Sequence, residues 1–200
     1  MTAVPAGPCV QADSQLPDAP HDPNAKATMN LDSLIRTRRT HKAYGSEPVD
    51  QATLLELFEL ARWAPNHHLT NPWRFRVLGP RARALLAHEA ELEKQGAASK
   101  LERAPTLIVL GVELQGDPSQ QHDDLLAAAI AGYIVLLAAH ARGLAGYWRT
   151  LPILEKPTVR AGLAIPAEEQ PIGLLHLGHP VQAQRAPERA PVDDIAIFLD

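Results

Sequence analysis

Hydrophobic residues recur at helical spacing in two segments near the start of the patterned sequence. The first segment begins at Leu31 and ends near a cluster of arginines, so we expect a short helix there. In the second, Asp50 is placed to cap a helix, because a carboxylate accepts hydrogen bonds from the free amides of a first turn, and Pro65 stops that helix. The apolar face of the second helix consists of Leu54, Leu57, Phe58 and Ala61.

Four later segments have the pattern of strands. Over 73–77, apolar residues alternate with arginines, which predicts a strand whose odd-numbered side chains are buried. The run 106–114 is apolar throughout and is bounded by a proline and a glycine, which is typical of a central strand. Two further strands are expected at 144–148 and 172–177.

Helices are expected between these strands, at 81–95 and 157–163. A longer Ala-rich helix lies between them. Asp123 and Asp124 favour its start through the positive helix N-terminus, and Arg142, followed by glycine, suits its end. Strands scattered among helices in this order predict a layered α+β domain rather than a regular βαβ series.

The two ends of the chain lack such patterning. Residues 1–28 contain five prolines and no apolar periodicity, which predicts a disordered tail. The pattern begins just after Met29, so both Met1 and Met29 stay open as translation starts. We expect one domain over 29–200. Its last part, about 179–200, is an irregular extension, long for a compact monomer, and we expect it to wrap around a partner chain.

Composition narrows the classes of function. A net charge of -4 argues against nucleic-acid binding, because phosphate backbones are bound through a surplus of Lys and Arg, and a small-molecule partner is expected instead. The single cysteine, Cys9, can form no internal disulfide, and no secretory signal is legible, which together predict a cytoplasmic protein. The uncharged run 125–139 is shorter than the roughly 20 residues needed to span a membrane, so we interpret it as a buried helix.

Four cations and two hydroxyl groups are concentrated in residues 36–42. Arginine supplies planar multidentate donors, threonine a hydroxyl, and Lys42 a compact charge, so this segment can bind a phosphate. The same cations could instead complement the C-terminal end of the preceding helix. Both interpretations stay open from the residues alone.

Two other segments could contact a bound ring. The polar loop 64–73 offers Asn and His as donors and acceptors, or these side chains satisfy backbone groups around its prolines. A metal site is less well supported, because adjacent His67 and His68 point in different directions and no third ligand has zinc-like spacing. Segment 143–150 has small residues that permit close approach, and its Trp148 packs either on a ligand or in the core.

Two common enzyme classes lack their motifs in this sequence. Neither Gly-x-x-x-x-Gly-Lys-Ser/Thr nor Gly-x-Gly-x-x-Gly after a strand is present, which argues against nucleotide-loop chemistry. A serine hydrolase needs its nucleophile in a strained turn. The serines considered without such a setting are Ser33, Ser46, Ser99 and Ser119.

Taken together, these segments resemble the nitroreductase family over about residues 30–200, especially its compact branch of NAD(P)H nitroreductases. Each motif is short, and their joint order carries the resemblance. The motifs are Arg38–Thr40, Ala64–His67, Asn71–Phe75, Trp148–Thr150 and Leu177–Pro180. The resemblance implies an α+β fold with a mainly antiparallel central sheet flanked by helices, and an intertwined homodimer that buries two FMN molecules between its chains.

The resemblance also assigns residues to that cofactor. Arg38 and Thr40 match the family's phosphate-binding residues, Lys42 would lie near flavin N1 and O2, His67 would contact the flavin, and Arg189 looks like the C-terminal phosphate arginine. The full set of cofactor-binding residues is Arg38, Arg39, Thr40, Lys42, His67, Asn71, Trp148, Arg149, Thr150 and Arg189.

The sequence departs from the family pattern at two places. Many relatives have Gln where Asn71 stands, and many have a second cation just before Arg189, where this chain has Pro187 and Glu188. No motif reports a preference for NADH or NADPH.

The activity that the resemblance implies is ping-pong reduction of nitroaromatics, quinones or similar electron-poor molecules, with NAD(P)H as reductant. No side chain is required as nucleophile or obligatory acid, and no metal is expected. The alternatives are the same fold with another flavin reaction, such as dehalogenation, enone reduction or flavin breakdown, a non-catalytic FMN-binding protein, and a structural domain without cofactor.

Overall fold

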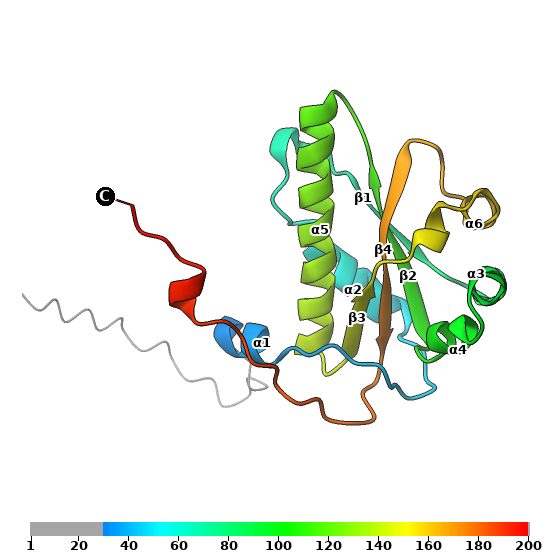
Figure 1. The fold of residues 1–200 in the computed structure, drawn as a ribbon, viewed down its shortest axis with the longest axis horizontal. Coiled ribbons are helices and arrows are strands. Elements are labelled where there is room, and N and C mark those ends of the chain that lie inside the picture. Colours follow the sequence, from blue (N-terminus) through cyan, green and yellow to red (C-terminus); the bar gives the residue numbers. More distant parts are fainter. Residues whose placement is uncertain (1–29, 200) are drawn as a thin grey trace, which may run out of the picture.

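A four-stranded sheet forms the centre of the fold (Figure 1). The computed structural model describes residues 30–199, so the tail expected over 1–28 and the candidate start at Met29 lie outside the described residues. In the order in which they pair, the strands are β1 (Trp73–Val77), β2 (Thr106–Glu113), β4 (Glu169–Gly178) and β3 (Ala145–Arg149). All three pairings are antiparallel, which confirms the predicted fold class.

Strand β2 is apolar throughout because both of its faces are buried. Ile108 and Leu110 belong to one core cluster and Leu107 and Val109 to the other, and none of the four is more than 1% exposed. Continuous apolar strands are most common in parallel sheets covered on both faces. Here an antiparallel strand is covered in the same way, which confirms the prediction of a central strand.

Two helices, α2 (Gln51–Ala61) and α5 (Pro118–Ala141), cover one face of the sheet. Asp50 caps α2 as predicted, because its carboxylate accepts a hydrogen bond of 2.9 Å from the amide of Thr53. By length and composition alone α5 could cross a membrane, but half of its apolar stretch is buried inside the fold. It packs against both α2 and the sheet, as expected of a buried helix.

Three helices cover the opposite face: α3 (Pro80–Glu93), α4 (Ala97–Glu102) and α6 (Pro157–Gly162). The 3-10 turn η2 (Pro152–Glu155), just before α6, packs on the same face. The helices predicted at 81–95 and 157–163 are confirmed. Helix α4 was not predicted, because six residues are too few to show apolar periodicity.

The start of α5 corrects one prediction. Asp123 and Asp124 do not begin the helix, which starts at Pro118 with Asp117 as its N-cap. The Asp117 carboxylate accepts hydrogen bonds from the amides of Ser119 and Gln120 at 2.9 and 3.1 Å. An acidic cap followed by proline at the first helical position is a common helix start. Asp124 lies in the second turn instead, and is buried.

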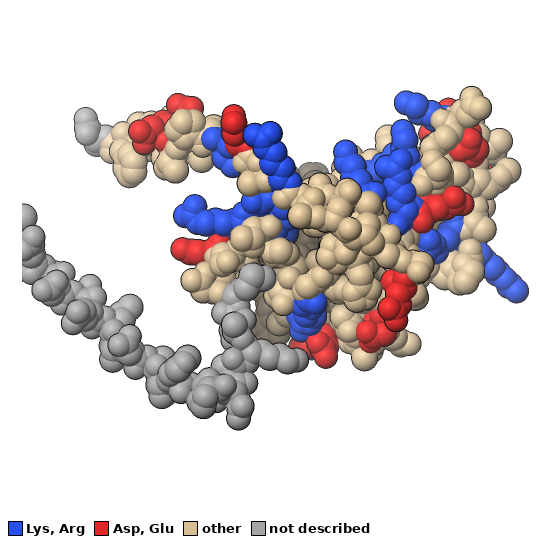
Figure 2. All heavy atoms as spheres, turned by 90° about the horizontal axis from the view of Figure 1, so that it is seen from below, with Lys and Arg blue, Asp and Glu red and all other residues tan. Residues whose placement is uncertain are grey.

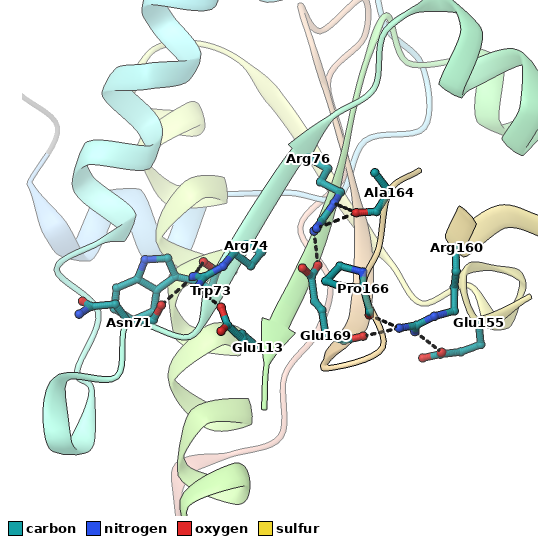
Figure 3. A network of polar contacts seen from close by, with 10 residues as sticks. All are labelled: Asn71, Trp73, Arg74, Arg76, Glu113, Glu155, Arg160, Ala164, Pro166 and Glu169. Carbon is teal, nitrogen blue, oxygen red and sulfur yellow. Dashed lines mark hydrogen bonds and ion pairs between the residues drawn. The ribbon is translucent and has the colours of Figure 1, made fainter. Parts of the chain in front are cut away.

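Strand β1 is held at the sheet edge by a network of ion pairs (Figure 3). Arg74 pairs with Glu113, and Arg76 with Glu169, which is only 2% exposed. Both arginines therefore have structural partners. The expectation that the odd-numbered residues of this strand are buried is wrong for Val77, which is 46% exposed because it ends an edge strand outside both core clusters.

The two ends of the described chain carry little core. Helix α1 (Leu31–Thr37) has no buried residue. Beyond β4, residues 179–199 are almost entirely exposed and contain one 3-10 turn, η3 (Val192–Asp194), which agrees with the predicted irregular extension. Figure 1 shows this extension leading away from the sheet and past α1.

Candidate functional site

Residues 38–44 lie along the outer edge of β3 and place a run of cations there. The amide of His41 donates a hydrogen bond of 3.2 Å to the carbonyl oxygen of Gly146, in β3. Immediately after this segment, the amide of Gly45 donates to the carbonyl oxygen of His179 at 2.9 Å. The cationic segment is therefore tied both to β3 and to the root of the C-terminal extension.

A first pocket, of about 290 Å³, gathers four arginines from the two ends of the described chain. It is lined by Arg38, Arg39, Thr40, Gln184, Arg185, Pro187 and Arg189. The structure thus brings three of the predicted cofactor residues, Arg38, Arg39 and Thr40, together with Arg189. It also adds Arg185, which supplies the second cation that the sequence lacks immediately before Arg189.

The first two arginines of this phosphate-type pocket differ in their bonding. The guanidinium of Arg39 donates to the carbonyl oxygens of Arg36 and Arg38 at 2.6 and 2.8 Å. Arg39 therefore complements the end of α1, as the alternative interpretation held. The guanidinium of Arg38 makes no hydrogen bond within residues 30–199, so it is available to a ligand.

A second pocket, of about 270 Å³, continues from the same segment along β3 and β4. Its lining consists of Lys42, Tyr44, Lys100, Arg103, Tyr147, Arg149 and His176. Lys42 and Arg149 were assigned to the cofactor, whereas Lys100 and Arg103 were not, because they come from the short α4 region that lacks a motif. Figure 2 looks onto this end of the molecule and shows Lys and Arg side chains over it.

His176 contributes an unusual polar group to this second pocket. It is 2% exposed, its Nε2 atom has no hydrogen-bond partner, and its ring lies 5.4 Å from that of Tyr147. Burial, with help from Arg149 and Arg83, lowers the pKa of His176 to about 4. The imidazole is therefore neutral near neutral pH. In the sequence, the only feature that could have pointed to His176 is that it is a titratable residue within an otherwise apolar predicted strand.

Tyr44 closes the same pocket from the cationic segment. Its hydroxyl donates a hydrogen bond of 2.7 Å to the carbonyl oxygen of His41. Burial, and the nearby Tyr147, raise the pKa of Tyr44. The second pocket therefore combines cations at its rim with neutral aromatic and imidazole groups.

The loop that carries His67 is held in a strained conformation. His68, Leu69 and Asn71 all have positive φ, between 51° and 59°. Such backbone is costly for residues other than glycine and persists only where the surroundings fix it. The Asn71 amide group donates back to the carbonyl oxygen of Leu69 at 2.7 Å, so this side chain serves the loop itself.

Asp124 anchors this loop to α5. Its buried carboxylate accepts a hydrogen bond of 2.5 Å from the hydroxyl of Thr70. Thr70 in turn accepts from the amide group of Asn66 at 3.0 Å. Asn66 also accepts from the backbone amide of Asn71 at 2.7 Å. A buried acid therefore fixes the shape in which His67 is presented.

His67 is not brought to the cations within one chain. It lines a separate, shallow pocket against the N-terminal half of α5, with Leu126 and Ile130 among its neighbours. In Figure 1 this loop lies at the upper end of α5, whereas residues 38–44 pass below its lower end. A single chain therefore holds the predicted cofactor residues in two separate places.

The half-buried side chain of Trp148 packs against the core. A Cβ added to Gly173 would come within 2.1 Å of its Nε1 atom, and one added to Gly132 within 2.6 Å of its ring. The indole therefore fills the space left by two glycines, in β4 and α5, which is the core alternative for this residue. Thr150, two residues on, is exposed at the end of β3.

The described residues contain no group of three or more His, Cys, Asp or Glu side chains placed to hold a metal ion. The charge that the site offers to a ligand within residues 30–199 is therefore that of Lys and Arg. Such a donor set suits phosphate and other oxyanions.

The amino-acid sequence matches the Nitroreductase family over residues 35–179. It is 26% identical over 177 residues to a Bacillus subtilis protein named "Putative NAD(P)H nitroreductase YfhC", a match that covers 82% of this chain and 91% of that protein.

The fold is also similar to solved structures. A nitroreductase-like family protein from Bacillus cereus superposes with a TM-score of 0.77 at 22% identity, covering 86% of this chain and 96% of that one. A Desulfovibrio desulfuricans protein, described as a putative nitroreductase in complex with FMN, superposes with a TM-score of 0.70 at 26% identity, covering 84% and 95%.

Proposed function

This chain belongs to the nitroreductase family, and from that premise we propose that it is an FMN-dependent oxidoreductase with NAD(P)H as its reductant. When bound, FMN would accept a hydride at N5 from NAD(P)H and pass the reducing equivalents to a nitroaromatic, a quinone or a similar electron-poor molecule. The relatives support the cofactor, since one solved neighbour is described as an FMN complex.

The observation that carries this proposal is the convergence of Arg38 and Arg189 in one pocket, although about 150 residues separate them in the sequence. A dianionic phosphate needs several charge-assisted donors, and this pocket offers them together with the hydroxyl of Thr40. The pocket that begins at Lys42 lies next to it along the same segment. The residues therefore fit a ligand with a phosphate at one end and a polar ring at the other.

Two residues of the second pocket, Lys42 and His176, can serve that ring in a defined way. The Lys42 ammonium would stabilise negative charge at N1 and O2, which grows as flavin is reduced. His176 offers a neutral imidazole whose Nε2 atom lacks a partner and can form a hydrogen bond with the ring edge. Beyond Trp148, the exposed Thr150 can contact the ring through its backbone or hydroxyl. The protein thus binds and orients the cofactor, and water can supply protons.

We further propose that two chains assemble into the active form. Leu126, Ile130 and Tyr133 recur at helical spacing on the outer face of α5 and are 50%, 41% and 39% exposed. The strained loop of His67 lies beside this face. Pairing through α5 would bury the apolar stripe and bring His67 of one chain to the cations of its partner. The exposed extension 179–199 would then wrap around the second subunit.

The proposal is tested on the purified full-length protein. We expect a flavin absorption spectrum, a dimeric mass by light scattering, and bleaching of the flavin when NADH or NADPH is added without oxygen. Menadione or a nitroaromatic should then restore the oxidised spectrum. A colourless protein that does not take up added FMN would overturn the proposal. A flavin that NAD(P)H fails to reduce would favour the non-catalytic FMN-binding alternative.

A further inference from the structure

The second pocket holds more positive charge than a flavin ring requires. Its rim carries Lys42, Lys100, Arg103 and Arg149, and no Asp or Glu lines it. None of these four side chains makes an ion pair or a hydrogen bond within residues 30–199. Elsewhere in residues 30–199, several other cations form ion pairs with glutamates. These cations are Arg74, Arg76, Arg142, Lys156 and Arg160. Four cations without an acidic partner among the described residues therefore meet at this one pocket.

A bound FMN would use only part of this charge. Its phosphate has its own arginines, including Arg38 and Arg189, in the neighbouring pocket. Reduced flavin adds about one negative charge at N1 and O2, for which Lys42 is sufficient. Lys100 and Arg103 have no role in that account. Like charges held together without an anion repel one another, so their grouping indicates a ligand that brings negative charge.

The geometry favours an aromatic anion. Lys100 and Arg103 stand one helical turn apart at the end of α4, so both can reach a single anionic group. A guanidinium binds a carboxylate through two parallel hydrogen bonds, and an ammonium adds a compact charge. The half-buried ring of Tyr147 lies in the same pocket and offers a flat, weakly polar surface.

Building on the proposed function, we propose that the electron acceptor is an aromatic or quinoid molecule with a carboxylate, which Lys100 and Arg103 bind. For a quinone carboxylate the balanced reaction is NAD(P)H + H⁺ + quinone → NAD(P)⁺ + hydroquinone. The carboxylate takes no part in this redox change. Lys100 and Arg103 therefore act on affinity and orientation, and are specificity-determining residues.

Two isosteric acceptors test the inference directly. We expect the full-length protein to reduce 4-nitrobenzoate with a kcat/KM about tenfold higher than that for 4-nitrobenzamide, mostly through a lower KM. In Arg103→Gln, and more fully in Lys100→Gln with Arg103→Gln, this ratio should fall toward one. Lys94→Gln, an exposed lysine outside the pocket, is the matched control and should keep the wild-type ratio.

Binding gives a readout that does not depend on turnover. Benzoate should bind the oxidised protein in calorimetry more tightly than benzamide, and the difference should shrink in Arg103→Gln and with added salt. A ratio near one in a yellow, NADH-reducible wild-type protein would overturn this inference and leave the proposed function intact. A KM change confined to NADPH, with NADH unaffected, would also overturn it, because the cations would then serve the 2′-phosphate. A protein without flavin would overturn both.

Discussion

The backbone amide of His41 donates a hydrogen bond to the carbonyl oxygen of Gly146, and the two atoms are 3.2 Å apart. This bond joins a segment near the start of the fold to an edge strand that lies about a hundred residues later in the chain. It fixes Arg38 on one side of the contact and Lys42 on the other. The two candidate pockets are therefore lined by the same segment, which this bond holds against β3. Because each pocket uses a different residue of the segment, a substitution at Arg38 tests one pocket and a substitution at Lys42 tests the other.

Loss of the Arg38 guanidinium should weaken FMN binding. Arg38 lines the phosphate-type pocket, and its guanidinium makes no hydrogen bond within residues 30–199. Removing one charge-assisted contact costs about 1.5–3 kcal/mol, so Arg38→Ala should raise the Kd for FMN about tenfold to a hundredfold. Fluorescence titration of the apoprotein measures this. The exposed Arg81 on α3 provides the control, and Arg81→Ala should bind FMN like wild type. Unchanged retention by Arg38→Ala would remove the phosphate assignment.

Replacing Lys42 should make the bound flavin harder to reduce. An ammonium near N1 and O2 favours the reduced, negatively charged form. Lys42→Gln should therefore lower the two-electron midpoint potential by roughly 30–60 mV, equivalent to about 1.4–2.8 kcal/mol. Potentiometric titration with a reference dye measures the shift. A potential that stays the same in a fully loaded variant would contradict the placement of Lys42, and Lys94→Gln again serves as control.

The neutral state of His176 should make stability depend on pH. Its pKa is about 4 in the folded protein against 6.5 for an unperturbed histidine, with burial as the main cause. Below pH 6.5 the unfolded chain therefore binds a proton that the folded protein does not, and stability falls until the pH reaches the folded pKa. The contribution is fully present above pH 6.5.

Urea unfolding of wild type and His176→Leu checks this sign. Between about pH 7 and pH 5, wild type should lose about 2 kcal/mol more than the variant, because one pKa unit corresponds to 1.36 kcal/mol. Comparing the two proteins cancels the contributions of His41 and His140, whose pKa values are also lowered by burial and by Arg38. Parallel pH profiles would show that His176 titrates normally.

A methyl group at Gly173 should destabilise the fold. Its Cβ would lie 2.1 Å from the Nε1 atom of Trp148, inside the core. Overpacking of this kind costs about 1–3 kcal/mol, so Gly173→Ala should lower Tm by several degrees. At Gly45 an added Cβ would meet only atoms 3.9 Å away, so Gly45→Ala should melt like wild type. Equal melting of the two variants would contradict the packing described for Trp148.

A charge on the outer face of α5 should separate the proposed dimer. Ile130 lies in the exposed apolar stripe of that helix, next to the pocket of His67. Ile130→Lys should give a monomeric mass by light scattering and a lower flavin content, because His67 would no longer reach a partner. Leu92→Lys changes an equally apolar but unrelated position, 68% exposed on α3, and should remain dimeric. A dimeric, flavin-loaded Ile130→Lys protein would refute pairing through this face.

Much of the fold could be predicted from the sequence, because its strongest signals are local. Alternation, apolar runs and an acidic cap identified all four strands and most of the helices. The errors have physical causes. The cap before Pro118 was overlooked in favour of Asp123 and Asp124, and α4 is too short for periodicity. Val77 is exposed because alternation along a strand does not report whether a helix covers its end.

The candidate site was predictable only where a motif carried it. Arg38 and Lys42 stand in a recognisable cluster, whereas Lys100 and Arg103 reach the pocket through tertiary packing alone. Arg185 could not be predicted either, because it lines the pocket of Arg38 only through the path of the irregular extension. The unpaired state of His176 depends on neighbours in three dimensions and could not be derived from an apolar strand pattern. The roles of all these residues at the cofactor remain predictions.

Helix α5 holds the loop of His67 near its first turns and the contact between His140 and Thr37 near its last. At 1.5 Å per residue, its 24 residues span about 36 Å. In the proposed pair the length of this helix sets the distance between the two active sites, because each end of the helix contributes to a different one. A shift of one helical turn between the two paired α5 helices would misalign both active sites at once. A correctly assembled pair would therefore have two working sites, and a misassembled pair would have none.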